Sequence, residues 1–348
     1  MRMNIPVGIS DFEQIRSKGY YYIDKSGMIA EILKSESTAV TLITRPRRFG
    51  KTLGMSMLSS FFDIRTDSRE LFQELEISKD TELCRRWQNQ YPAIFLSFKD
   101  VDGLTFESAY EMLSATITDL YKKHLYLLDS AQINAYDKEI MHQIIEGRAS
   151  VTEIKKSLAL LITAMRQHYG RQVILLLDEY DVPVAKASSH GYYAQMMEVI
   201  KALMSTTLKD NASLQFAVLT GCLKIAKESI FTGTNNFVSD TITSSHLNEY
   251  LGLTQKDVDS LLEVMQAAEQ AENVRKWYDG YHFGEFDVYC PWDVMNYLRD
   301  LQRDDKAKPA SYWKNTSDNA IIRSFIDYAG SSITRKLEIL MSGGYFNQ

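Results

Sequence analysis

Five consecutive apolar residues followed by two acids constrain the fold of this chain more than any other segment. The run occupies residues 173–177, Val-Ile-Leu-Leu-Leu, and Asp178 and Glu179 follow it directly. A strand that is apolar on both faces is typical of a parallel sheet covered by helices on both sides. Ligands of such sheets bind outside the carboxyl ends of the strands, where these two acids stand. The segment therefore predicts a buried strand with a candidate site at its tip.

The two acids suit different tasks, because successive side chains of a strand point in opposite directions. We assign Asp178 as a candidate Mg²⁺ ligand and Glu179 as the candidate general base that polarises an attacking water. The alternative for this pair is a solvated acidic turn with no chemical role. A phosphate-binding loop elsewhere in the chain would favour the first interpretation.

Such a loop is predicted at residues 45–52, where Arg-Pro-Arg-Arg-Phe-Gly-Lys-Thr follows an apolar run at 39–43. A strand, a basic loop, Gly-Lys-Thr and a helix form the context of a phosphate-binding loop, because N–H groups at the helix N-terminus point at the anion. Lys51 is expected to reach the β- and γ-phosphates and the Thr52 hydroxyl to bind Mg²⁺. Arg45 replaces the first glycine of the usual pattern, and Gly-Lys-Thr alone is common by chance.

The loop and the acidic strand together predict an ATP-binding site. The candidate nucleotide-binding residues are Arg45, Pro46, Arg47, Arg48, Phe49, Gly50, Lys51, Thr52 and Leu53. Lys51 also counts as catalytic together with Glu179, and the candidate magnesium ligands are Thr52 and Asp178. The loop's guanidinium groups either face the phosphates or pair with acids of the same chain or of a neighbour.

Strand-like and helix-like segments alternate along the chain, which predicts an α/β fold with a mostly parallel sheet and helices on both faces. The expected strands are 39–44, 93–98, 173–177, 214–219 and 237–243. The expected helices are 25–33, 52–62, 106–128, 151–168 and 192–208. The composition changes after residue 247, where helices are expected from 254 to about 271 and from 291 to 301 around an aromatic, glycine-rich stretch.

The chain also resembles the bacterial AAA-ATPase-like family, a branch of the P-loop ATPases related to archaeal and STAND ATPases. The resemblance rests on YYYIDK at 20–25, TRPRRFGKTL at 44–53 and LLLDEYDVPV at 175–184. Further matches are LTG at 219–221, SIF at 229–231, NN at 235–236, WYDGY at 277–281 and YWKNTS at 312–317. In that family an Arg-Pro-Arg-Arg loop replaces the first glycine, which would account for Arg45.

The resemblance implies a three-layer αβα P-loop sandwich over residues 1–246, leading segment included, and a mainly helical lid over 247–348. It also implies the class of P-loop ATPases with an additional strand and a catalytic glutamate. Thr220 would then be a polar sensor near the γ-phosphate or its attacking water, and a capping or turn hydroxyl is the equal alternative. The aromatic residues of this region either pack between small helices, which is the favoured interpretation, or form a platform for base stacking.

Two functions agree with this resemblance. The first is an ATPase that hydrolyses ATP with Mg²⁺ to drive a conformational change. The second is a slow nucleotide-gated switch that regulates a nuclease-like effector. Members of the family commonly carry such a domain after the ATPase region, where this chain ends at Gln348, so truncation or absence of the effector is expected. A nuclease-like partner, DNA and a homo-oligomer all stay open.

Charge and cysteine content limit the possible binding partners and the cellular compartment of this chain. The net charge of −6 provides no global basic field for nucleic acid or an anionic membrane, so DNA contact would need a local patch. Three widely spaced cysteines without a Cys-x-x-Cys pair argue against a zinc site or a disulfide framework and favour the cytoplasm. The N-terminus lacks a signal core, and no run approaches the ~20 apolar residues of a membrane span.

Overall fold

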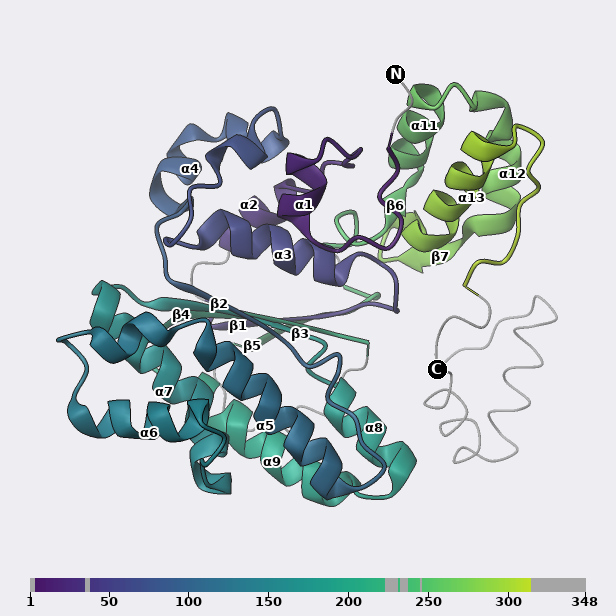
Figure 1. The fold of residues 1–348 in the computed structure, drawn as a ribbon. Helices are drawn as coiled ribbons and strands as arrows, with labels where there is room; N and C mark the ends of the chain where they lie inside the picture. Colours follow the sequence, from purple (N-terminus) through teal and green to yellow (C-terminus); the bar gives the residue numbers. More distant parts are fainter. Residues whose placement is uncertain (1–3, 35–37, 223–230, 232–236, 245, 314–348) are drawn as a thin grey trace.

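A five-stranded sheet lies at the centre of the computed structural model, which describes residues 4–34, 38–222, 231, 237–244 and 246–313. All neighbouring strands are parallel, in the order β2-β3-β4-β1-β5 (Figure 1). The strands are β1 (Val40–Thr44), β2 (Ala93–Ser97), β3 (Val173–Asp178), β4 (Leu214–Gly221) and β5 (Phe237–Asp240). Each of them corresponds to a segment that the sequence predicts as a strand.

The strand order places β4 between β1, which leads into the phosphate loop, and β3, which ends in the acids. In register, Ile43 pairs with Thr220 and Leu177 pairs with Leu219. On the other side of β3, Ser97 pairs with Asp178. Because the strands are parallel, the ends of β1, β2, β3 and β4 meet at one edge of the sheet, which is where ligands bind in such folds.

Helices cover both faces of the sheet and give the three layers of a P-loop-like sandwich (Figure 1). One face carries α1 (Phe12–Ser17), α2 (Gly27–Lys34), α3 (Lys51–Phe62) and α4 (Thr81–Trp87). The other face carries α5 (Phe106–Lys122), α6 (Ala135–Ile145), α7 (Val151–Tyr169), α8 (Val182–His190) and α9 (Tyr193–Leu208). Short 3₁₀ turns occupy Arg69–Phe72, Glu76–Lys79 and Leu125–Asp129.

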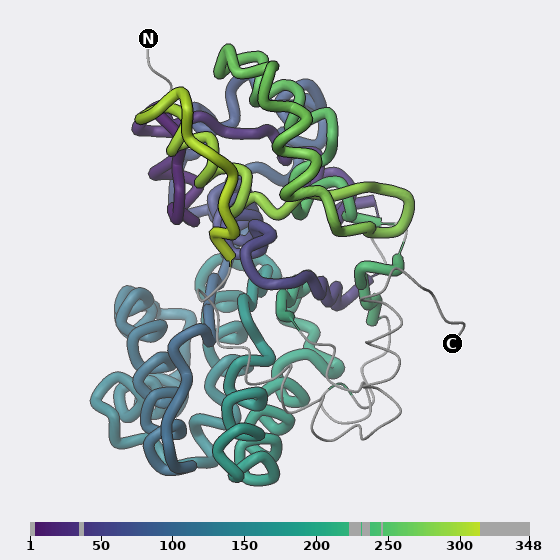
Figure 2. The backbone as a smooth tube through the Cα atoms, turned by 90° about the vertical axis from the view of Figure 1, so that its right-hand side faces the viewer, coloured from purple at the N-terminus to yellow at the C-terminus, as the bar shows by residue number. Residues whose placement is uncertain are grey.

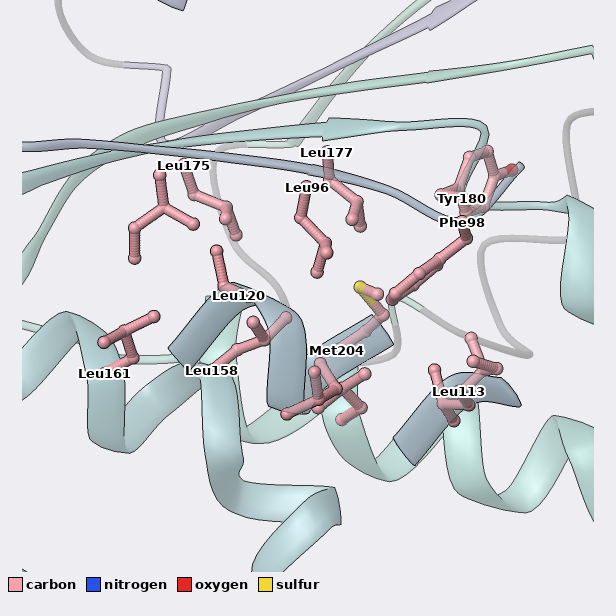
Figure 3. Close-up of a cluster of buried hydrophobic side chains, with 14 of the residues drawn as sticks. Leu96, Phe98, Leu113, Leu120, Leu158, Leu161, Leu175, Leu177, Tyr180 and Met204 are labelled. Atoms are coloured by element: carbon pink, nitrogen blue, oxygen red, sulfur yellow. The ribbon is translucent and has the colours of Figure 1, made fainter. Parts of the chain in front are cut away.

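The alternation of side chains along β3 explains its unbroken apolar sequence. Leu175 and Leu177 pack with α5, α7 and α9 in one core, as Figure 3 shows. Ile174 and Leu176 belong to the opposite core, which α1, α3 and α4 cover. Every residue of β3 is buried as a result. The strand is therefore fixed by apolar burial on both faces, as its sequence predicts.

Two helices are shorter than the sequence predicts. The expected helix over 106–128 ends at Lys122, and a separate turn at Leu125–Asp129 then places Leu127 in the core. The helix expected from 254 to about 271 ends at Val264, because the backbone turns at Gln266 with φ +55°. The helix α8 is unforeseen, although Pro183 in its first turn and Gly191 after its end are typical boundary residues.

The C-terminal region, residues 253–313, combines three helices with a small antiparallel sheet. Its elements are β6 (Leu253–Thr254), α11 (Gln255–Val264), a 3₁₀ turn (Ala268–Gln270), α12 (Ala271–Tyr278), β7 (Asp279–Phe283), β8 (Phe286–Tyr289) and α13 (Pro291–Arg303). The aromatic, glycine-rich stretch forms the β7–β8 hairpin. Part of the YWKNTS match, the NN match and most of SIF lie outside the described residues.

The N-terminal segment lies against this C-terminal region, as both ribbon views show (Figures 1 and 2). Ile5, Tyr21 and Ile23 pack on its apolar core. The Lys25 ammonium donates to the Asp257 carboxylate at 2.5 Å, and both side chains are largely buried. The N-terminal segment and the C-terminal region are therefore in direct contact.

Candidate nucleotide-binding site

The predicted phosphate loop connects β1 to α3 through residues 45–50. Gly50 precedes α3 with φ +82°, a left-handed conformation that glycine adopts without a side-chain penalty. The helix starts at Lys51, so the first N–H groups of α3 have no partner within the helix. These N–H groups and the positive end of the helix dipole make the loop a suitable anion site.

Lys51 is buried, with 4% of its surface exposed. Its ammonium donates to the carbonyl oxygens of Arg45 and Pro46, both at 2.9 Å. The Cys222 sulfur lies 3.5 Å away, directly after the end of β4. The lysine therefore lies over the loop itself, beside the tips of the central strands.

Asp178 is fully buried and accepts hydrogen bonds from two candidate site residues. The Thr52 hydroxyl donates to its Oδ2 atom at 2.8 Å, and the Thr220 hydroxyl donates to its Oδ1 atom at 2.5 Å. Ser97 donates to Oδ2 at 3.4 Å. Segments 126 and 42 residues apart in the chain thus converge on a single carboxylate. The distance between the loop and the acidic strand is well within the span of a nucleotide.

Glu179 follows Asp178 with φ +52°, an uncommon conformation for a residue with a side chain. Burial raises the pKa of Glu179, and the Asp178 carboxylate raises it further, while Lys51 and Arg47 lower it. Asp181 also raises this pKa, and its Oδ2 atom accepts from the Cys222 N–H at 3.0 Å. A carboxylate with a raised pKa is a stronger proton acceptor, which suits a general base.

The three arginines of the loop have different surroundings. The Arg45 side chain is buried and pairs with Asp240 at 2.5 Å, and it also donates to Asn248 Oδ1 at 2.7 Å. Of the two sequence-based alternatives, Arg45 therefore pairs with an acid of the same chain, and only its carbonyl faces Lys51. Arg48 stacks on Trp292 of α13, with 3.7 Å from its guanidinium carbon to the ring centroid. The charge of Arg47 acts on Glu179.

A cavity of about 270 Å³ adjoins the loop. The predicted site residues that line it are Arg48, Phe49, Gly50, Lys51, Thr52, Leu53 and Glu179. Other parts of its wall include residues 6–10, residues 21–23 with Lys25, and Trp292 and Met295 of α13. Sequence reasoning missed the first and last of these groups, because neither has a motif or periodicity that points to the site.

The donor set fits Mg²⁺ bound together with a triphosphate. Thr52 and Asp178 offer one hydroxyl and one carboxylate, and Mg²⁺ usually takes few protein ligands while it keeps water and phosphate oxygens. Within the described ranges, no group of three or more His, Cys, Asp or Glu side chains is arranged to hold a metal ion.

Comparison with known proteins agrees with this geometry. The model of the family described as "Predicted AAA-ATPase" matches residues 6–231, more than half of the chain. The chain belongs to this predicted AAA-ATPase family. The match covers the N-terminal wall of the cavity, the phosphate loop, the acids after β3 and Thr220. A general ATPase-like function follows from this membership.

A curated relative extends the similarity beyond the family match. "Uncharacterized protein in vnfD 5'region" of Azotobacter chroococcum mcd 1 is 28% identical over 296 residues, which cover 84% of this chain. The same alignment covers 51% of the relative, so this chain spans about half of that protein's length. In the portion described by the structure, no helix has the length and apolar character needed to cross a membrane.

Proposed function

We propose that this AAA-ATPase family member binds ATP with Mg²⁺ at the phosphate loop and hydrolyses it to drive a conformational change. The observation that carries the proposal is the convergence of Thr52 and Thr220 on the buried Asp178 carboxylate, next to Lys51. A solvated acidic turn would not account for a fully buried carboxylate that accepts from two other segments.

Each residue has a role in this proposal. The N–H groups at the start of α3 and the Lys51 ammonium bind the phosphates. To do so, Lys51 gives up its hydrogen bonds to the Arg45 and Pro46 carbonyls. Thr52 and Asp178 would hold Mg²⁺, which neutralises phosphate charge when bound. Glu179 accepts a proton from the attacking water, and the Thr220 hydroxyl orients that water or the Asp178 carboxylate.

The decisive experiment is the Lys51→Ala variant, measured by titration calorimetry with ATP and Mg²⁺. Loss of the closest counter-charge is expected to remove measurable binding, whereas the wild-type chain binds. Lys99→Ala serves as a matched control, because Lys99 is exposed and lies outside the site. Tight ATP binding by the Lys51→Ala variant would refute the site assignment.

A second candidate function is a slow nucleotide-gated switch for a nuclease-like effector. Its support is the close contact of the N-terminal segment and α13 with the nucleotide cavity, which would make domain arrangement depend on the ligand. Single-turnover and steady-state rates distinguish the two functions. A tightly bound nucleotide with turnover slower than about one per minute would favour the switch, and median enzyme rates near ~10 s⁻¹ would favour the ATPase.

The proposal also covers the cellular compartment and the binding partners of the chain. Cys84, Cys222 and Cys290 are free thiols, which supports a reducing, cytoplasmic compartment. A neighbouring copy that supplies or receives an arginine would make turnover depend on protein concentration. Turnover per chain that is constant over a hundredfold dilution would exclude an obligatory oligomer, and fluorescence anisotropy with labelled DNA would test nucleic acid as a partner.

A further inference from the structure

Three bulky side chains of the predicted phosphate loop make contacts with distant parts of the chain. Arg45 reaches into a buried pair with Asp240, and Phe49 is fully buried. Arg48 stacks on Trp292. In a glycine-rich loop the backbone adopts its turns without such side-chain contacts. Here the side-chain contacts of Arg45, Arg48 and Phe49 hold the loop in its conformation instead.

Phe49 and Arg48 both attach the loop to the C-terminal region. The Phe49 ring lies 4.8 Å from the Tyr281 ring, edge to face, and 5.2 Å from the Phe283 ring of the same hairpin. The Cys290 thiol donates to the Arg48 carbonyl at 3.9 Å. The loop is therefore embedded between the β7–β8 hairpin and the start of α13.

Arg48 has φ +70°, in the left-handed region that is strained for a residue with a side chain. Such a conformation persists when surrounding contacts determine it. Two contacts of Arg48 are the Trp292 ring, which faces the guanidinium, and the Cys290 thiol at the carbonyl. Both belong to the C-terminal region, more than 200 residues along the chain.

We propose that Trp292, together with the Tyr281 and Phe283 rings, positions the phosphate loop, so that the loop is competent for ATP only while the C-terminal region is docked on it. This inference rests on the proposed nucleotide function. It makes Trp292 a positioning residue that acts through Arg48, and it gives the C-terminal region a physical means to control nucleotide affinity.

The test compares Trp292→Ala with Trp277→Ala, a control in the same region whose ring is 52% exposed. Affinity is measured by calorimetry for ATP and for inorganic tripolyphosphate, each with Mg²⁺. Trp292→Ala is expected to weaken both ligands about tenfold, the order of a lost cation–π contact, while Trp277→Ala leaves them unchanged. Trp292→Phe, which keeps an aromatic face, should recover most of the affinity.

Tripolyphosphate separates positioning from direct contact, because Trp292 also lines the cavity. A loss for ATP with unchanged tripolyphosphate affinity would mean that Trp292 contacts the nucleoside, and would overturn the proposal. Arg48→Gly adds a second criterion, since glycine reaches φ +70° without the side-chain penalty. The Arg48→Gly/Trp292→Ala double variant should bind at least as tightly as Trp292→Ala alone, whereas additive losses would contradict a shared pathway.

Folding and the parent proposal are monitored separately. Circular dichroism and the Tm of each variant report folding, and Tyr281→Leu tests the same link from the hairpin side with an expected several-fold loss of tripolyphosphate affinity. If the wild-type chain binds ATP and Lys51→Ala does not, equal affinities of Trp292→Ala, Tyr281→Leu and the wild type would refute only the positioning role. A wild-type chain without ATP affinity would refute the proposed function as well.

Discussion

Glu179 combines an unfavourable backbone conformation with a partly desolvated charge. Its φ of +52° and its position beside Asp178 both carry an energetic cost. Costs of this kind concentrate at functional sites, where the reacting group needs a fixed direction and a shifted pKa. Both features are what the proposed general base requires.

Glu179→Gln is expected to keep ATP affinity and to slow hydrolysis on the order of a hundredfold or more, the usual contribution of a positioned base. Steady-state phosphate release with matched binding titrations measures this effect. Glu263→Gln, on the exposed side of α11, is a suitable control. Unchanged turnover in Glu179→Gln would remove this residue from the mechanism.

The pH dependence follows from the same pKa shift. Because burial and Asp178 raise the pKa of Glu179 above its ordinary 4.5, the base is protonated at a higher pH than a free glutamate. We expect kcat/KM to fall, as pH decreases, with a midpoint above 4.5. A fall of kcat/KM in acid with a midpoint at or below pH 4.5 would contradict a desolvated base.

The same raised pKa of Glu179 lowers folding stability at neutral pH. A carboxyl whose folded pKa is raised destabilises the folded state at pH above that pKa, where its charge is present. At neutral pH, Glu179→Gln should therefore increase the Tm slightly while it reduces turnover, and the increase should vanish in acid. A lower Tm at neutral pH would show that Glu179 stabilises the fold.

Arg45 shows that a residue within a phosphate-loop pattern can have a structural role. Its guanidinium and the Asp240 carboxylate have 0% and 3% exposed side chains, so neither charge is solvated. Removing one partner of such a pair leaves the other charge buried and uncompensated. The pair therefore ties the start of the loop to the end of β5.

Asp240→Ala is expected to reduce the free energy of unfolding by about 3–5 kcal/mol in urea denaturation. Asp67→Ala breaks the exposed pair between Asp67 and Arg69 and should leave the free energy of unfolding nearly unchanged, because water screens exposed charges. Similar small changes in both variants would mean that water reaches Arg45 after the substitution.

At the scale of elements, the sheet order decides which residues meet. Inserting β4 between β1 and β3 places Thr220 next to Asp178, although 42 residues separate them. The hairpin β7–β8 has a comparable effect on the other side of the loop, where it encloses Phe49. Gly252 lies at this junction with φ +119°.

Gly252→Ala is expected to destabilise the chain by about 1–3 kcal/mol and to weaken ATP binding. A Cβ atom there would lie 2.2 Å from Val288 Cγ1 and 3.1 Å from the Phe49 ring, so the hairpin or the loop must shift. Gly280→Ala is the matched control, because no atom lies within 4 Å of its added Cβ. Equal stability and affinity of the two variants would contradict tight packing at the junction.

At the scale of the whole molecule, the cavity beside the predicted phosphate loop lies between separate parts of the chain. Its wall combines the sheet edge, the N-terminal segment and α13, which are distant in the chain. The ion pair between Lys25 and Asp257 of α11 joins the N-terminal segment to the C-terminal region directly. A ligand in this cavity would contact both the sandwich and the C-terminal region.

ATP with Mg²⁺ at about 100 times its Kd is therefore expected to stabilise the folded chain by about 2.7 kcal/mol. Thermal unfolding should show a single transition that shifts upward by several degrees, because the ligand links both parts. Lys51→Ala should show no shift. Stabilisation of only one of two separate transitions would contradict a shared cavity.

Local pattern alone predicted the five strands, a phosphate loop and a site at the acids, because burial on two faces imposes a readable periodicity and Gly-Lys-Thr has a defined context. It also predicted a common site for Lys51, Thr52 and Asp178. The role of Arg45, the hairpin around Phe49 and the cavity walls at residues 6–10 and Trp292 emerged only from the tertiary structure. These features depend on contacts between segments that can lie more than 240 residues apart in the sequence. Packing determines such contacts, and no local periodicity encodes them.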